Sequence, residues 1–275
     1  MEPPADVPTQ PGFDSLAGTH IADRYDVHDL IGVGGTCEVY LATDTLLDIP
    51  VALKRVRPDY VHRKEFRKRM IKEARRGRIP DPRIAAIHEV VTWGDELMLV
   101  MEYVKGESLT KRIERGLSLD DFWRMAKECL EALRAAHDKG LIHRDIKPDN
   151  IMVTEGGSIK MLDFGLAHRI SGVNADLGAS TASLAVPAGT PRYMSPEAYR
   201  GAELDERADI FSLGVVFYQM LCGMPPFQAR NWSELNDEIL HFDPPPPCKN
   251  RRVSNRLSGV VMTMIAKKPE DRFAS

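Results

Sequence analysis

The chain has 275 residues, of which 43% are hydrophobic and 28% charged, and its formal net charge is −3. This length allows one large domain or two lobes with a sizeable core, and the balanced charge argues against bulk nucleic-acid binding. No apolar run reaches the roughly 20 residues that span a bilayer, and the four widely spaced cysteines form no metal motif. We therefore expect a cytoplasmic protein with reduced thiols and no membrane contact within this segment.

The N-terminal part of the chain reads as a tail followed by strands. Residues 1–20 are rich in proline and glycine with few large apolar side chains, so we expect a flexible tail. Two strand-like segments, Tyr25 to Ile31 and Glu38 to Thr43, then flank a glycine-rich stretch, Gly32 to Cys37. Glycines there would let backbone N–H groups approach phosphate oxygens, although such strings are also common in tight turns. The stretch does not open a helix, so it does not fit the dinucleotide-binding motif.

A lysine stands in the next apolar strand, Val51-Ala52-Leu53-Lys54, and its charge needs a partner. The helix expected from about Arg63 to Gly77 can supply one, because Glu73 lies on its apolar face. The run Leu97 to Met101 predicts a further strand that ends at a break in the pattern.

Helical patterns dominate the second half of the chain. Ser118 followed by Asp121 resembles a capping box, and an amphipathic stripe then continues until Gly140, which can terminate the helix. The short apolar run from Ile210 to Cys222 predicts a buried helix.

A predicted hairpin sets the spacing of the most informative polar residues. Two short apolar strands, from 151 to 153 and from 159 to 162, are joined by a glycine-rich turn. A hairpin brings strand ends together, so Asn150, just before it, and Asp163, just after it, are expected side by side. Their amide and carboxylate oxygens suit Mg²⁺. Nearby, Asp145 can accept a proton and Lys147 can offset the charge of a moving phosphoryl group, which is what phosphoryl transfer requires.

These motifs, from the glycine-rich stretch to His143-Arg144-Asp145 and Asp163-Phe164-Gly165, resemble the eukaryotic-like (Hanks-type) protein kinases. The match extends over about Arg24 to Ser275 and is most similar to the bacterial serine/threonine branch. It implies an α+β, two-lobed fold: a small β-rich N-lobe with one key helix and a larger, mainly helical C-lobe. The lobes would comprise residues 21–104, with the hinge, and 105–275. Because the end of the chain resembles the start of the last kinase helix, we expect a fragment of a longer protein, with room for a membrane anchor outside it.

The resemblance further implies an ATP-dependent protein serine/threonine kinase that uses Mg²⁺, with Mn²⁺ as an alternative. A Lys54–Glu73 ion pair would aim Lys54 at the phosphates, and Met101 would be the gatekeeper of the adenine pocket. The family usually has a third glycine where this chain has Cys37, which is either a reactive thiol or, as we favour, an unreactive small residue. The expected ATP-binding residues are Ile31, Gly32, Val33, Gly34, Gly35, Thr36, Cys37, Val39, Ala52, Lys54, Met101, Glu102 and Val104.

On the substrate side, the resemblance assigns Asp145 to orienting the acceptor hydroxyl and accepting its proton late. Lys147 and Thr190 are typical of kinases that act on serine and threonine. Glu197 is expected to pair with Arg272, and Asp209 to brace the catalytic loop.

Regulation would centre on the activation loop, which runs from Asp163 to about Glu197. Arg144, beside Asp145, is placed to receive a phosphate from this loop. Thr181 and Ser183 are the candidate phosphosites, with simple solubilising loop residues as the alternative for either one.

The expected partners are protein substrates with serine or threonine acceptors and a kinase dimer for phosphorylation in trans. Two alternatives remain: a pseudokinase that binds partners without catalysis, and a small-molecule phosphotransferase of the same fold. The first is disfavoured because Lys54, Asp145 and Asp163 are all present, and the second by the peptide platform around Thr190 and Glu197.

Overall fold

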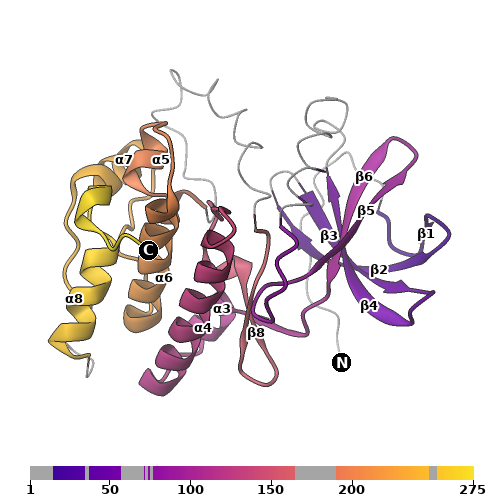
Figure 1. Cartoon of the computed structure of the whole chain (residues 1–275), viewed down its shortest axis with the longest axis horizontal. Coiled ribbons are helices and arrows are strands. Elements are labelled where there is room, and N and C mark those ends of the chain that lie inside the picture. The colour runs from indigo at the N-terminus through magenta and orange to yellow at the C-terminus, as the bar shows by residue number, and fades with distance from the viewer. Residues whose placement is uncertain are drawn as a thin grey trace. The chain divides into compact units, whose positions relative to one another are not determined.

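The computed structural model describes residues 15–34, 37–56, 71, 74, 77–164, 190–247 and 253–275. The chain divides into two compact units (Figure 1). Unit 1 combines Met1–Arg63 with Glu89–Tyr103, and unit 2 combines Lys64–His88 with Val104–Ser275.

Unit 1 is built on a six-stranded sheet in the order β1-β2-β3-β4-β6-β5. Its strands are β1 (His20–Ile21), β2 (Tyr25–Val33), β3 (Cys37–Asp44), β4 (Ile49–Val56), β5 (Ile87–Trp93) and β6 (Glu96–Glu102). β2 pairs with β3, β3 with β4 and β4 with β6, each time antiparallel. Along each strand, successive side chains point to opposite faces of the sheet. One face forms a hydrophobic core that includes Tyr25, Tyr40, Leu53 and Val100.

Unit 2 is mainly helical and carries a three-stranded sheet in the order β7-β8-β9. The strands are β7 (Gly106–Ser108), β8 (Ile151–Thr154) and β9 (Ile159–Met161). The α-helices are α3 (Leu109–Glu114), α4 (Leu119–His137), α5 (Pro196–Tyr199), α6 (Glu206–Cys222), α7 (Trp232–His241) and α8 (Asn255–Met264). Short 3₁₀ turns are η1 (Pro148–Asn150), η3 (Thr190–Tyr193) and η4 (Pro269–Asp271).

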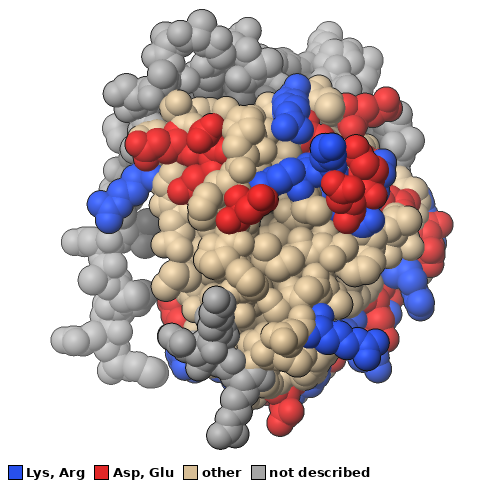
Figure 2. Space-filling model, turned by 90° about the vertical axis from the view of Figure 1, so that its left-hand side faces the viewer, with Lys and Arg blue, Asp and Glu red and all other residues tan. Residues whose placement is uncertain are grey.

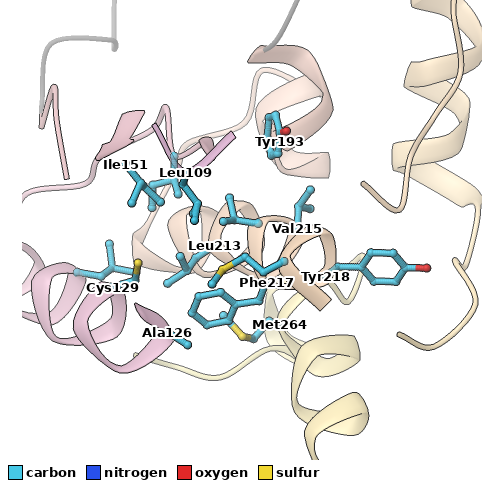
Figure 3. Packing of buried hydrophobic residues seen from close by; sticks show 14 of the residues in the cluster. Leu109, Ala126, Cys129, Ile151, Tyr193, Leu213, Val215, Phe217, Tyr218 and Met264 are labelled. Atoms are coloured by element: carbon cyan, nitrogen blue, oxygen red, sulfur yellow. The ribbon is translucent and has the colours of Figure 1, made fainter. Parts of the chain in front are cut away.

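Helix α6 forms the centre of unit 2, because its residues are buried on nearly every side. Phe217 of α6 meets Phe122 of α4 edge to face, with ring centroids 5.6 Å apart. On another side α6 packs against α8, and Figure 3 shows residues of α4, α6 and α8 in this one core. The close approach depends on Gly214, since a Cβ atom there would lie 2.6 Å from the Cβ atom of Met264.

The local signals in the sequence agree with these elements. Ser118 is the N-cap of α4 and accepts a hydrogen bond from the Asp121 amide at 3.0 Å. The expected strands are present at 25–33, 37–44 and 96–102, and the apolar run at 210–222 is the buried helix α6. Of the helix expected at 63–77, Ile71, Ala74 and Gly77 are described; the first two are helical and Gly77 lies in a turn.

Figure 2 shows lysine, arginine, aspartate and glutamate side chains interspersed above a broad uncharged area on one face of the molecule. Among the described residues on this face, neither sign of charge dominates. Binding to a nucleic-acid phosphate backbone would require an excess of positive charge. Within the described ranges, no helix combines the length and apolarity needed to cross a membrane.

Candidate active site

The catalytic loop of unit 2 leads into the β8–β9 hairpin, which brings its two ends together. Ile151 pairs with Met161 and Val153 with Ile159 across the hairpin. The Leu162 amide donates a hydrogen bond to the Asn150 carbonyl at 2.8 Å, so Asn150 lies beside the residue that precedes Asp163. The juxtaposition expected from the sequence is therefore present.

Asp145 receives two side-chain donors on one carboxylate oxygen. Lys147 Nζ lies 3.0 Å from Asp145 Oδ2, and Asn150 Nδ2 lies 2.9 Å from the same atom. The Asn150 amide group also donates to the Asp145 carbonyl at 2.8 Å. Both Asp145 and Lys147 are mostly buried, with about a sixth of each side chain exposed. The three residues thus form one hydrogen-bonded group.

Asp209 holds the loop through its backbone. Its Oδ2 accepts from the His143 amide and its Oδ1 from the Arg144 amide, each at 2.7 Å, and the carboxylate is fully buried. Arg144 has a φ angle of 68°, a left-handed conformation that a residue with a side chain adopts only when its surroundings hold it there. The expected brace by Asp209 is present, at the first turn of α6.

The donor set fits a magnesium ion. Both hydrogens of the Asn150 amide point to Asp145, so its Oδ1 atom faces away as an acceptor. Asp163 supplies a carboxylate, and its φ angle of 63° is again left-handed. The part of the chain that the structure describes holds no cluster of three or more histidine, cysteine or acidic residues of the kind that cages a metal by itself. Two protein oxygens are what Mg²⁺ takes when it keeps waters and binds phosphates.

The expected nucleotide residues of unit 1 share one face of the sheet. Val39 is paired with Lys54, and Ala52 with Met101. Directly paired residues lie on the same face, as do Ala52 and Lys54 at i and i+2. The hydrophobic core occupies the opposite face, with Leu53 and Tyr40. Lys54 is therefore directed away from the core.

Between β2 and β3, the Gly34 amide donates a hydrogen bond to the Cys37 carbonyl at 2.8 Å. Ile31 and Val33 are exposed on β2, whereas Cys37 is buried, which favours an unreactive thiol. Gly32 pairs with Val39, and Glu102 ends β6, one residue before the end of unit 1. Val104 is buried and begins the next segment of unit 2. Gly35 and Thr36 lie outside the described residues.

The proposed substrate platform is fixed by a buried ion pair. Arg272 donates to both carboxylate oxygens of Glu197, at 2.7 and 2.8 Å, as expected from the sequence. Burial acts to raise the pKa of Glu197, but the hydrogen bonds and charge of Arg272 hold it below its ordinary value. The backbone of Thr190 begins η3, while Glu73, Thr181 and Ser183 lie outside the described residues.

Sequence reasoning missed several residues that anchor this platform. The Tyr193 hydroxyl donates to Gln219 Oε1 at 2.7 Å, and the Ser212 hydroxyl donates to the Tyr193 carbonyl at 2.7 Å. Arg192 donates to two backbone carbonyls, of Phe227 and Ala229, each at 2.9 Å. These contacts join residues 19 to 37 positions apart, so no local pattern could reveal them.

Comparison with known proteins places this geometry in a family. The model of the protein kinase domain family matches residues 25–275. The chain is 35% identical over 263 residues to the serine/threonine-protein kinase PknB of Mycobacterium tuberculosis, covering 93% of this chain and 41% of that protein. It is 38% identical over 265 residues to a probable serine/threonine-protein kinase PknB of Corynebacterium glutamicum, covering 92% of this chain and 40% of that protein. It thus spans about two fifths of the length of these curated relatives.

The structural comparison agrees with the sequence comparison. The crystal structure of the M. tuberculosis PknI kinase domain matches with a TM-score of 0.73 at 27% identity, covering 95% of this chain and 94% of that one. The match includes both the β-rich unit and the mainly helical unit. The chain therefore belongs to the protein kinase family, in its bacterial serine/threonine branch, and has the protein kinase fold.

Proposed function

We propose that this domain is an ATP-dependent protein serine/threonine kinase, which transfers the γ-phosphate of ATP to serine and threonine hydroxyls of protein substrates. The observation that carries the proposal is the convergence of Lys147 and Asn150 on one oxygen of Asp145. Asp145 Oδ2 thus binds two fixed donors, and in our proposal Oδ1 accepts from the substrate hydroxyl.

In the proposed reaction, Asp145 orients the hydroxyl so that its oxygen attacks the γ-phosphorus in line. The P–O bond to ADP breaks as the new P–O bond forms, and the hydroxyl proton passes to Asp145 late in the step. Lys147, 3.0 Å from Asp145, offsets the negative charge of the transferred group. Lys54, on the open face of β4, would contact the α- and β-phosphates.

Asn150 and Asp163 are the residues that would hold the metal ion, Mg²⁺ or alternatively Mn²⁺. When bound, such an ion neutralises phosphate charge and orients the phosphate groups. The chain's own contribution is to keep the Asn150 amide oxygen turned away from Asp145, while the Asn150 carbonyl is bonded to Leu162, the residue before Asp163.

The decisive experiment measures the intact mass of the protein, and of a generic basic protein substrate, after incubation with ATP and Mg²⁺. Wild type should gain phosphate in steps of one phosphoryl group. Asp145→Asn should lose about 10²-fold or more of the rate, because it removes the proton acceptor. Asp138→Asn, an equally conservative change at an exposed residue after α4, should retain activity.

The pseudokinase alternative predicts a different result. Wild type would then add no phosphate to itself or to the added substrate, although it could still bind nucleotide. Retained activity in Lys54→Met would contradict the phosphate contact but leave the kinase assignment intact.

We also propose regulation by autophosphorylation in trans within a kinase dimer, on Thr181 or Ser183, with Arg144 receiving the phosphate. The rate of autophosphorylation per molecule should then rise with protein concentration. Peptide mapping should place phosphate at one of these two positions, and the double variant to alanine should lose it. A rate independent of concentration would indicate phosphorylation within one molecule instead.

A further inference from the structure

His137, the last residue of α4, hydrogen bonds to the carboxylate that braces the catalytic loop. Its ring is buried, with 7% of the side chain exposed, and Nε2 lies 2.9 Å from Asp209 Oδ2. With Asp209 ionised, Nε2 must carry the hydrogen and donate it. Asp209 therefore accepts one side-chain donor from α4 as well as two backbone donors from the loop.

The second ring nitrogen of His137 faces another acid of α6. Nδ1 lies 3.9 Å from Glu206 Oε2, and 39% of the Glu206 side chain is exposed. A partly exposed acid, a buried imidazole and a fully buried carboxylate thus follow one another from solvent to the loop. Glu206 also lines an open cavity of about 300 Å³ together with Gly140 and Ile142, which precede the loop. Both acids belong to α6, whereas the ring belongs to α4, and the hydrogen bond is the one to Asp209.

We propose that His137 is a positioning residue for phosphoryl transfer: its donation to Asp209 fixes the carboxylate that holds the His143 and Arg144 amides, and through them Asp145. This role rests on the proposed kinase function. A buried carboxylate that loses a donor must rotate toward another partner or take up a proton, because it cannot remain under-bonded at low cost. Rotation of the carboxylate releases a loop amide, and the left-handed backbone at Arg144 then relaxes.

A positioning role for His137 and simple filling of the core predict different kinetic effects. A merely structural histidine would affect stability and leave turnover per folded molecule unchanged. A positioning residue affects kcat and leaves the KM for ATP unchanged, because the loop orients the acceptor hydroxyl. A substitution that restores the donor should also restore the rate.

The test compares His137→Leu, which keeps the volume but removes the donor, with His137→Gln, whose side-chain amide can donate to Asp209. We expect kcat to fall about tenfold or more in His137→Leu, with the KM for ATP within about twofold of wild type, and to recover most of this loss in His137→Gln. If His137→Leu does not fold, His137→Asn replaces it, since its shorter amide stops short of Asp209.

A surface histidine supplies the matched control. His241 hydrogen bonds to Asp237 at the same distance, 2.9 Å, but both side chains are well exposed. His241→Leu should leave kcat unchanged. Wild-type kcat in His137→Leu, or equal losses in His137→Leu and His137→Gln, would overturn the proposal.

Hydrogen exchange separates failure of this proposal from failure of the kinase function. The peptide containing the His143 and Arg144 amides should exchange faster in His137→Leu and at the wild-type rate in His137→Gln, whether or not the protein turns over ATP. An inactive wild type with this exchange pattern would refute the kinase function alone. Equal exchange in all three proteins would refute the positioning role.

Discussion

Arg272 joins several separate segments of unit 2 through its guanidinium group. Besides its two bonds to Glu197, it donates to the backbone carbonyls of Ala266, Arg207 and Lys267. Its guanidinium also lies over the Phe211 ring, 4.9 Å from the centroid. An arginine can make these contacts at once because its five donors lie in one plane and its face can stack, which a lysine cannot reproduce.

The buried ion pair predicts a pH-dependent stability that Glu197→Gln should remove. The folded-state pKa of Glu197 lies below its ordinary value near 4.5, so its contribution is complete above that pH and is lost as the pH falls toward the folded-state pKa. At pH 7 the variant should lose about 3–5 kcal/mol, because Arg272 keeps its buried charge. Urea denaturation of both proteins from pH 7 to pH 3 should show the difference shrinking below pH 4.5.

An exposed glutamate provides the control for this measurement. Glu155 pairs with Lys105 at 3.1 Å, and more than two thirds of each side chain is exposed. Glu155→Gln should therefore change stability by less than about 1 kcal/mol. A Glu197→Gln difference that stays constant down to pH 3 would show that the ion pair is not its source.

At the scale of single residues, contacts could be predicted from the sequence where the two residues are close in the chain or belong to one motif. Asn150 and Asp163 could be placed together because a short hairpin joins them. The link between His137 and Asp209 joins residues 72 positions apart, and it left no trace in the periodicity of α4. The positive φ of Arg144 was equally invisible, since it is imposed by Asp209 and not by the residue itself.

Among the elements, α6 shows how a helix is specified when every side is buried. It has no polar stripe, so its apolar run predicts burial but not which neighbours it contacts. The N-cap at Asp205 and the left-handed C-cap at Gly223, with φ of 79°, mark its ends. Its partners become evident only from packing, and at Gly214 the side chain of Met264 in α8 packs where a Cβ atom would otherwise lie.

Two glycine-to-alanine changes on facing helices should have opposite effects. Gly214→Ala places a methyl group against Met264 and Ile265, at 2.6 and 2.8 Å, and should destabilise the protein by about 1–3 kcal/mol. Gly259→Ala in α8 meets nothing within 4 Å and should stabilise it by about 0.5–1 kcal/mol through helix propensity. Thermal unfolding of the two variants tests this, and destabilisation by both would mean that the α6–α8 contact is not the cause.

In the whole molecule, the proposed reaction depends on residues of both units. Unit 1 carries Lys54, and unit 2 carries Asp145, Asn150 and Asp163. The family and fold could be recognised from sequence because the motifs occur in a fixed order. The division of the chain could not be read from the sequence, since unit 2 also includes Lys64–His88, which ends inside β5, and unit 1 resumes at Glu89.

Nucleotide binding should stabilise the whole domain and depend on the metal ligands. At about 100 times its Kd, ADP with Mg²⁺ should add roughly 2.7 kcal/mol to the free energy of unfolding. In wild type, a chelator should remove the part of this stabilisation that depends on Mg²⁺, and Asp163→Asn should lose that same part. Lys54→Met should reduce the stabilisation both with Mg²⁺ and with chelator. Thermal melts with ADP and either Mg²⁺ or chelator measure both effects; a wild type that ADP does not stabilise would favour the pseudokinase alternative.

The hydrogen bonds from the catalytic loop to Asp209 also have a consequence for synthesis of the chain. The loop emerges from the ribosome 65 residues before the carboxylate that shapes it at Arg144. At elongation rates of ~5–20 residues per second, several seconds pass before Asp209 is made, and longer before α6 leaves the exit tunnel. Once Asp163 has been added, the nascent chain carries the proposed catalytic side chains yet lacks the carboxylate that shapes their backbone. Onset of activity is thereby delayed until most of unit 2 has been translated.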